Sequence, residues 1–262
     1  MLRTSAKRVA GAAAPIVTAN VSSVAGRPQS TSAPRVDVVI PARDEEESIG
    51  QAIESLPAAS VARVIVVDNG SRDRTAEAAR RAGATVVSEP RRGYGAACLA
   101  GLAFLRARPP DVVAFLDADL SEDPAQLPEL LAPIREGRAD LVIGSRTLGE
   151  RETGSLTPVQ EFGNRLATFL LRLFFGARFT DLGPFRAIRW EALERLDMRD
   201  RGYGWTVEMQ ARAARAGLAC AEVPVRHRRR RAGRSKVAGT LGGMLGAGVK
   251  IPLTILRVRL GG

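Results

Sequence analysis

Residues 112–120 read Val112-Val113-Ala114-Phe115-Leu116-Asp117-Ala118-Asp119-Leu120, an apolar run that ends in two carboxylates. The β-branched and aromatic residues are typical of a buried strand, and the i, i+2 spacing places Asp117 and Asp119 on one face at its end. Two carboxylates with no adjacent base suit a hard divalent cation, Mg²⁺ or Mn²⁺. Because an ion with few protein ligands completes its shell with phosphate oxygens, we expect a phosphate-bearing ligand here.

Apolar runs alternate with helical patterns on both sides of this stretch. Strands are predicted at 36–40, 61–67, 84–88, 112–116, 140–144 and 221–225, and helices at 45–56, 72–82, 96–106, 126–136, 158–176 and 205–216. This alternation predicts an α/β fold, a mostly parallel sheet with helices on both faces. Ligands of such sheets bind outside the carboxyl ends of the strands, where Asp68, the loop 91–95, Asp117, Asp119 and Arg146 are all expected.

Charge is distributed unevenly along the 262 residues, which carry a net charge of +11. Residues 1–36 hold five Lys or Arg and no acid, residues 226–262 hold ten and no acid, and residues 37–225 therefore carry −4. A mildly acidic body with a basic end indicates a localised anionic partner. Cys98 and Cys220 have neither disulfide nor metal-ligand spacing, so we expect a reducing, cytoplasmic setting.

The two ends of the chain differ in composition from the domain predicted at 35–236. Residues 1–34 are rich in Ala, Ser and Val, with an apolar stretch broken by polar residues, and are expected to be a disordered leader. Residues 237–256 are apolar but Gly-rich and contain Lys250 and Pro252, which makes them too polar for a membrane span. We expect 237–262 to be an amphipathic tail that contacts an anionic membrane surface.

Three further features each have a functional and a structural interpretation. The loop Arg91-Arg92-Gly93-Tyr94-Gly95 suits phosphate binding but is not a dinucleotide fingerprint, because Cys98 stands at the third glycine position; a solvated basic turn is the alternative. Asp68 begins the turn sequence Asp68-Asn69-Gly70-Ser71, so a purely turn-forming role is also open. The single histidine, His227, is either a further metal ligand or a hydrogen-bonding residue.

The basic run 226–236 is expected to bind an anionic acceptor such as a lipid phosphate, through Arg230, Ser235 and Lys236 among others. Nucleic acid is the competing interpretation, since basic clusters are its usual first sign. Only 5% of the residues are aromatic and no stacking platform accompanies the run, so nucleic acid is not expected.

Five motifs, in this order, make the chain resemble the inverting family-2 glycosyltransferases. They are Val39-Ile40-Pro41-Ala42-Arg43-Asp44-Glu45, Val66-Val67-Asp68-Asn69-Gly70-Ser71, Asp117-Ala118-Asp119-Leu120, Gly144-Ser145-Arg146 and Gly233-Arg234-Ser235-Lys236. The set is most similar to dolichyl- and polyprenyl-phosphate mannosyltransferases. The resemblance implies the GT-A fold, a nucleotide-binding half merged with an acceptor half.

The resemblance also implies roles for single residues. Asp117 and Asp119 would hold Mg²⁺ or Mn²⁺ against the donor diphosphate, with His227 as a candidate further ligand. Residues expected to bind donor or acceptor are Pro41, Arg43, Glu45, Asp68, Arg92, Ala118, Arg146, Arg186, Arg230, Ser235 and Lys236. The sequence departs from the common pattern at Asp44, where Asn is usual, and at Ser121, where a metal-binding Gln is frequent.

Asp181 and Glu208 are the candidate catalytic carboxylates. A hydroxyl acceptor needs a carboxylate base, whereas a phosphate acceptor is already anionic and needs none. Either residue can instead cap a helix or orient Arg186.

These observations predict an enzyme that transfers a hexosyl group, with inversion, from GDP- or UDP-hexose to a polyprenyl phosphate at the cytoplasmic membrane surface. A soluble phosphorylated three-carbon acceptor, as in enzymes similar to glucosyl-3-phosphoglycerate synthase, is the alternative within enzymes. A nucleotide-sugar-binding regulator without turnover is the alternative from another class.

Overall fold

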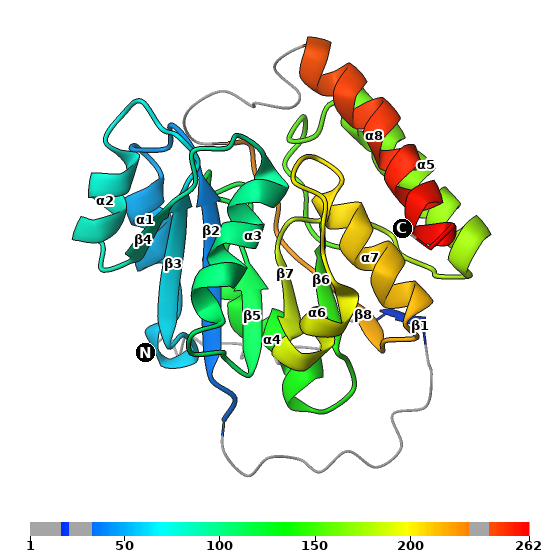
Figure 1. Cartoon of the computed structure of the whole chain (residues 1–262), viewed down its shortest axis with the longest axis horizontal. Helices are drawn as coiled ribbons and strands as arrows, with labels where there is room; N and C mark the ends of the chain where they lie inside the picture. Colours follow the sequence, from blue (N-terminus) through cyan, green and yellow to red (C-terminus); the bar gives the residue numbers. More distant parts are fainter. Residues whose placement is uncertain (1–16, 21–32, 231–240, 262) are drawn as a thin grey trace, which may run out of the picture.

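The computed structural model describes residues 17–20, 33–230 and 241–261, which build one eight-stranded sheet with helices on both faces (Figure 1). The strands are β1 (Val17–Asn20), β2 (Val36–Ala42), β3 (Arg63–Asp68), β4 (Thr85–Ser88), β5 (Val112–Phe115), β6 (Leu141–Ser145), β7 (Arg186–Arg189) and β8 (Cys220–Pro224). The α-helices are α1 (Ile49–Glu54), α2 (Thr75–Arg81), α3 (Tyr94–Leu105), α4 (Leu127–Arg135), α5 (Pro158–Phe175), α6 (Trp190–Leu196), α7 (Trp205–Arg215) and α8 (Leu241–Arg259). Short 3₁₀ turns, η1 (Ala58–Ser60) and η2 (Pro124–Gln126), complete the elements.

The sheet is mixed but mostly parallel, as predicted. Its order is β1-β8-β6-β7-β5-β2-β3-β4. Strands β5, β2, β3 and β4 are parallel neighbours, and β6 is parallel to β8. The strand β7 runs antiparallel between β5 and β6 and joins the two parallel groups. The carboxyl ends of both groups therefore lie at one edge of the sheet, where the sequence places its polar motifs.

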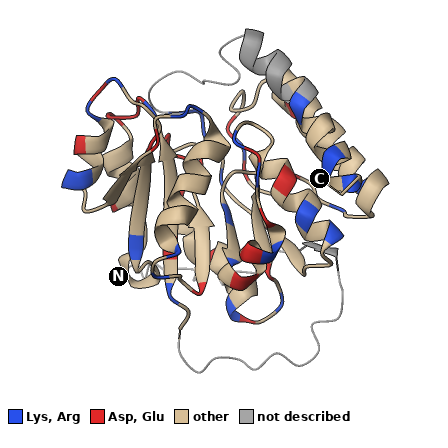
Figure 2. Cartoon of the chain, viewed as in Figure 1, with Lys and Arg blue, Asp and Glu red and all other residues tan. Residues whose placement is uncertain are grey.

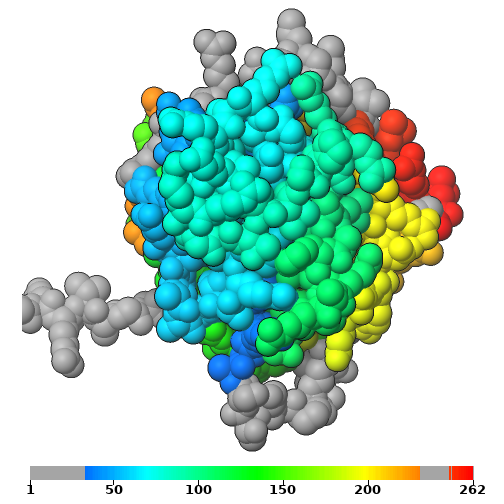
Figure 3. Space-filling model, turned by 60° about the vertical axis from the view of Figure 1, so that its left-hand side comes forward, coloured from blue at the N-terminus to red at the C-terminus, as the bar shows by residue number. Residues whose placement is uncertain are grey.

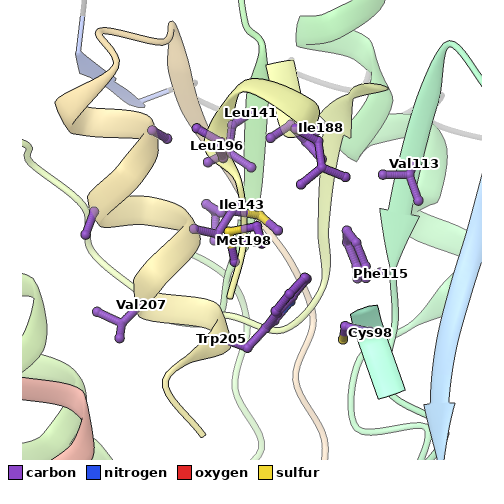
Figure 4. Close-up of a cluster of buried hydrophobic side chains, with 14 of the residues drawn as sticks. Cys98, Val113, Phe115, Leu141, Ile143, Ile188, Leu196, Met198, Trp205 and Val207 are labelled. Carbon is purple, nitrogen blue, oxygen red and sulfur yellow. The ribbon is translucent and has the colours of Figure 1, made fainter. Parts of the chain in front are cut away.

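The core lies in two layers because successive side chains of each strand point to opposite faces. Val39 and Phe115 point to the layer covered by α3, α5, α6, α7 and α8, whereas Val38 and Ala114 point to the layer that contains residues of α1, α2 and α4. In the first layer the rings of Phe115 and Trp205 pack edge to face, with centroids 5.9 Å apart (Figure 4). This contact ties the strand that precedes the two aspartates to the start of α7.

The C-terminal tail is a helix that packs on the body of the protein. Figure 1 shows α8 beside α5 and α7, and its Ile255 and Val258 are buried in the core. The described part of the predicted tail 237–262 is thus continuous with the domain, because α5 and α7 cover the side of the helix that carries Ile255 and Val258. Figure 2 shows basic positions along α8, and the helix carries Lys250, Arg257 and Arg259 but no acidic residue. In Figure 3 residues of the first half of the chain cover most of the visible face, and α8 lies at the right-hand edge.

Two expectations for the chain before residue 56 need correction. Residues 17–20, inside the predicted leader, form β1, whose Val17 and Thr18 pair with β8 and cover an otherwise exposed strand edge. The other leader residues up to 32 lie outside the described residues. The helix predicted at 45–56 begins only at Ile49, because Asp44 adopts a left-handed φ of 52° and accepts the backbone N–H of Arg72.

Candidate active site

A cavity of about 920 Å³ opens at the carboxyl edge of the sheet. It is lined by Pro41, Ala42, Arg43, Glu45, Asn69, Arg92, Gly93, Tyr94, Ala97, Asp117, Ala118, Asp119, Ser121, Glu122, Arg146, Ser155, Leu156, Thr157, Gln160, Pro184, Gly202, Tyr203, His227, Arg228, Arg230 and Lys250. The segments after β2, β3, β4, β5, β6 and β8 all contribute, which is the convergence that the strand-end argument predicts.

Carboxylates cluster on the floor of the cavity. Asp119, Glu122 and Glu45 are 7%, 2% and 6% exposed. Asp119 Oδ1 accepts the backbone N–H of Ser121 at 2.9 Å and lies 2.7 Å from Ser121 Oγ. Asp117 Oδ1 is buried and has no hydrogen-bond partner among the described residues. Burial, together with the negative charges of Asp119 and Glu122, raises the pKa of Asp117 well above its usual value.

This oxygen-rich cluster fits a divalent cation. A cation would satisfy Asp117 Oδ1 and offset the repulsion that raises the Asp117 pKa. Within the described ranges no group of three His, Cys, Asp or Glu side chains is arranged to hold a metal ion. The protein set is therefore sparse, and an ion held by Asp117 and Asp119 would depend on ligand oxygens to complete its shell.

His227 lies in the cavity wall, but the structure gives it a different neighbour from the one expected. Its Nδ1 lies 3.4 Å from Glu122 Oε1, and its backbone N–H donates to the carbonyl of Glu150 at 2.9 Å. The imidazole is 4% exposed. Among the described residues, His227 Nδ1 and Glu122 Oε1 are both buried without a hydrogen-bond partner, so metal ligation by His227 and the hydrogen-bonding alternative both stay predictions.

Arg230 reaches into the acidic cluster from the loop after β8. Its Nε donates to Asp119 Oδ2 at 2.9 Å, and its Nη1 donates to Glu45 Oε1 at 2.8 Å. Arg230 was expected to bind the acceptor phosphate, yet here it bridges two carboxylates that were assigned to ion and donor binding. Ser235 and Lys236, the other members of that expected site, lie outside the described residues.

Arg146 is held in the cavity wall by Asp181. The carboxylate of Asp181 accepts from Arg146 through the backbone N (2.7 Å), Nε (2.8 Å) and Nη2 (2.7 Å). Although burial acts in the opposite direction, the charge and hydrogen bonds of Arg146 lower the pKa of Asp181. Asp181 is fully buried and does not line the cavity. The structure thus favours the structural interpretation of Asp181 over the general-base one, with Arg146 rather than Arg186 as its partner.

Glu208 and Arg186 also lie behind the cavity and not in its lining. Glu208 accepts the backbone N–H of Asp200 at 2.7 Å and the Arg212 Nε at 2.9 Å. Arg186 is fully buried and donates to the carbonyls of Leu182 and Thr206, and burial lowers its pKa to about 10. Arg186 does not reach the cavity, because the loop before β7 uses its guanidinium to satisfy buried carbonyls, and its expected ligand-binding role stays a prediction.

In the turn after β3, Asp68 forms the turn and its neighbour Asn69 lines the cavity. Asp68 Oδ1 accepts the backbone N–H of Ser71 at 3.1 Å, as a turn-forming Asp does, and Asp68 does not line the cavity. Asn69 does, and it shapes the basic loop by donating to the carbonyl of Arg91 at 2.7 Å and accepting from the N–H of Gly93 at 2.9 Å. Arg92 lines the cavity as expected.

Several cavity residues were missed by sequence reasoning. Lys250 of α8 lies 3.2 Å from Asp200 Oδ1 and lines the cavity, as do Tyr203 and Gln160. Only the packing of α8 against α7 brings Lys250 here, so no local pattern marks it. Glu122 was within reach of sequence reasoning, because it lies only three residues after Asp119.

The sequence of the chain is similar to those of known glycosyltransferases. The family model described as glycosyl transferase family 2 matches residues 37–197. An uncharacterised glycosyltransferase of Mycobacterium tuberculosis is 42% identical over 211 residues, covering 80% of this chain and 93% of that protein. The undecaprenyl-phosphate mannosyltransferase of Micrococcus luteus is 33% identical over 223 residues, covering 80% and 90%.

Solved structures agree with the sequence relatives. The glucosyl-3-phosphoglycerate synthase of Mycobacterium tuberculosis, in complex with Mn²⁺, UDP and glucosyl-3-phosphoglycerate, superposes with a TM-score of 0.69 at 28% identity, covering 86% of this chain and 80% of that one. A structure described only as a mycobacterial protein gives a TM-score of 0.71 at 29% identity, covering 86% and 75%.

Proposed function

The chain belongs to glycosyl transferase family 2 and is a hexosyltransferase, and from this premise we propose that it moves a hexosyl group from a GDP- or UDP-hexose to a polyprenyl phosphate. The floor of the cavity, with Asp117 and Asp119, would hold Mn²⁺ or Mg²⁺. When bound, the ion offsets the charge that develops on the leaving nucleoside diphosphate. The structures of the glucosyl-3-phosphoglycerate synthase in complex with Mn²⁺ and UDP support a bound ion and a bound nucleotide in this proposal.

Basic side chains around the cavity supply the remaining phosphate contacts in this proposal. Three hydrogen bonds to the carboxylate of Asp181 hold Arg146 in place, so its guanidinium has a defined orientation. Arg92 and Lys250 add positive charge on the walls. Such groups bind and orient a diphosphate on one side of the sugar and an acceptor phosphate on the other.

The acceptor needs no protein base in this scheme. Asp181 is paired with Arg146, and Glu208 with Arg212 and backbone N–H groups, so neither lies where it could take a proton from an acceptor in the cavity. A phosphate monoester is anionic at neutral pH and attacks without deprotonation. The pairing of both candidate bases therefore supports a phosphate acceptor over a hydroxyl acceptor.

The observation that most supports a lipid acceptor is the exposed apolar surface of α5 and α8. Apolar side chains that are 40% to 86% exposed lie along these two packed helices and at the residue that follows α8, namely Val159, Phe162, Phe169, Leu173, Leu253, Leu256 and Leu260. Arg257 and Arg259 stand among them on α8. The same helices reach the cavity through Gln160 and Lys250. An apolar face with basic residues suits an anionic bilayer, from which a lipid phosphate can enter the cavity.

This surface would make the protein peripheral at the cytoplasmic face of a membrane. Among the described residues, no helix is both long and apolar enough to cross a bilayer. Contact through the exposed apolar side chains of α5 and α8 is the mode of association that we propose.

A soluble acceptor is the second candidate, favoured by one observation. The glucosyl-3-phosphoglycerate synthase structures, which cover 86% of this chain, hold phosphoglyceric acid together with UDP-glucose and Mn²⁺. A small phosphorylated acid would use the same basic walls without the apolar face of α5.

Transfer assays with matched variants distinguish the two acceptors. Labelled GDP-mannose or UDP-glucose is incubated with Mn²⁺ and either undecaprenyl phosphate in anionic vesicles or 3-phosphoglycerate in buffer. Phe169→Glu is expected to lower vesicle binding and transfer to lipid at least about tenfold, because the charge must be moved out of the apolar interface. Phe104→Glu, at a residue of α3 that is 40% exposed, serves as the control and should behave as the wild type. Labelled sugar found only in the phosphoglycerate product would favour the soluble acceptor.

A further inference from the structure

Arg230 lies where a cation is expected. Its guanidinium contacts Asp119 Oδ2 through Nε and Nη2, both at 2.9 Å, and Glu45 Oε1 through Nη1 at 2.8 Å. The contact joins the loop after β8 to the segments after β5 and β2, which lie 111 and 185 residues away in sequence. One positive charge thus holds together the acidic groups that would otherwise repel each other across the cavity floor.

We propose that Arg230 and the divalent ion compete for Asp119, so that Arg230 leaves this carboxylate when the ion and the donor diphosphate bind. This inference rests on the proposed ion site at Asp117 and Asp119. Asp119 Oδ1 already accepts from the Ser121 backbone, so Oδ2, the oxygen that Arg230 contacts, is the one left to face a ligand. A guanidinium and a divalent ion repel each other at such distances, so an ion bound at that oxygen weakens the Arg230 contact.

The loop geometry lets Arg230 move without disturbing the fold. The backbone just before it is fixed, because Arg228 N–H donates to the Ser121 carbonyl at 2.8 Å and His227 N–H to the Glu150 carbonyl. Arg230 itself is 25% exposed and lines the open cavity, and its side chain has several rotatable bonds. It can therefore exchange the two carboxylates for an anionic ligand within the same cavity.

This exchange makes ion and donor binding depend on each other. Without nucleotide, the ion must displace Arg230 from Asp119 and gains no diphosphate oxygens as ligands, so the affinity for the ion is low. With nucleotide, the diphosphate coordinates the ion and also offers the displaced guanidinium a new anionic partner. By thermodynamic linkage, each ligand then raises the affinity of the other by the same factor, and Arg230 is the positioning residue that sets this coupling.

The test is a Mn²⁺ titration, followed by electron paramagnetic resonance of free Mn²⁺, with and without UDP or GDP. Arg230→Ala is expected to bind Mn²⁺ alone about tenfold more tightly than the wild type and to lose most of the nucleotide-dependent gain in affinity. Arg230→Gln, closer in shape, should change in the same direction and covers the case in which the alanine variant does not fold. Arg229→Ala is the matched control, because it removes the same charge one residue away, where Arg229 contacts Glu152 and Thr153.

Three results would overturn the inference. Unchanged Mn²⁺ affinity in the folded Arg230 variants would show that no competition exists. An equal gain in Arg229→Ala would assign the effect to net charge alone. If the wild type with nucleotide binds Mn²⁺ no more tightly than Asp119→Ala does, the proposed ion site at Asp117 and Asp119 is wrong. That result would contradict the proposed function and not only the competition by Arg230.

Discussion

Asp181→Ala should destabilise the protein far more than the loss of an ordinary ion pair. Asp181 is fully buried and accepts three hydrogen bonds of 2.7–2.8 Å from Arg146, whose side chain is only 15% exposed. Removing one partner of a buried pair leaves an uncompensated charge and costs about 3–5 kcal/mol. We therefore expect the free energy of unfolding to fall by about that amount.

Urea denaturation followed by the fluorescence of the buried Trp190 and Trp205 measures this change. Glu77→Ala is the control, because its pair with Arg81 is also 2.8 Å long but both side chains are about 60% exposed; its loss should cost about 0.5 kcal/mol or less. A loss below about 1 kcal/mol for Asp181→Ala would refute the argument that this pair is structural. A stable Asp181→Asn variant without turnover would instead restore the general-base assignment.

Two further predictions concern the same fold. Burial raises the pKa of Glu222 from 4.5 to about 7. As the pH falls, the Glu222 carboxylate is therefore protonated in the folded protein before it is protonated in the unfolded chain. The free energy of unfolding should rise by up to about 3 kcal/mol as the pH falls from above 7 toward 4.5. Glu222→Gln should lack this contribution when unfolding is measured at pH 5 and pH 8, and an unchanged pH dependence would contradict it. Gly95→Ala should cost roughly 1–3 kcal/mol, because a Cβ there would lie 2.0 Å from the Asp200 carbonyl oxygen. The control Gly163→Ala, in open space on α5, should stabilise the helix by roughly 0.5–1 kcal/mol, and equal melting temperatures for the two would argue against the clash.

Local patterns predicted the sheet and the part of the site that follows its strands. The largely apolar runs that became β2, β3 and β5 are each followed closely by polar residues, so both the strand and the position of its functional side chains follow from one pattern. Pro41, Asp117 and Asp119 line the cavity for this reason.

The remaining site depends on contacts that no local pattern encodes. The charges of Arg186 and Glu208 can be read from the sequence, but their hydrogen-bond partners cannot. Arg186 donates to a buried carbonyl and Glu208 accepts from a buried N–H group, and these contacts keep both side chains out of the cavity. Lys250 reaches the cavity only because α8 folds back over α7. Asn69 and Asp68 are adjacent in one turn, and their roles differ because only Asn69 faces the basic loop.

The most direct test of the proposed function is transfer of labelled hexose from GDP- or UDP-hexose into the organic phase in the presence of polyprenyl phosphate vesicles and Mn²⁺. The wild type should produce an organic-soluble hexosyl lipid that disappears on chelation of the metal, and Asp119→Ala should lose at least about a hundredfold in rate because the leaving diphosphate is no longer stabilised. Metal-independent transfer, or undiminished transfer by a folded Asp119→Ala variant, would contradict the account.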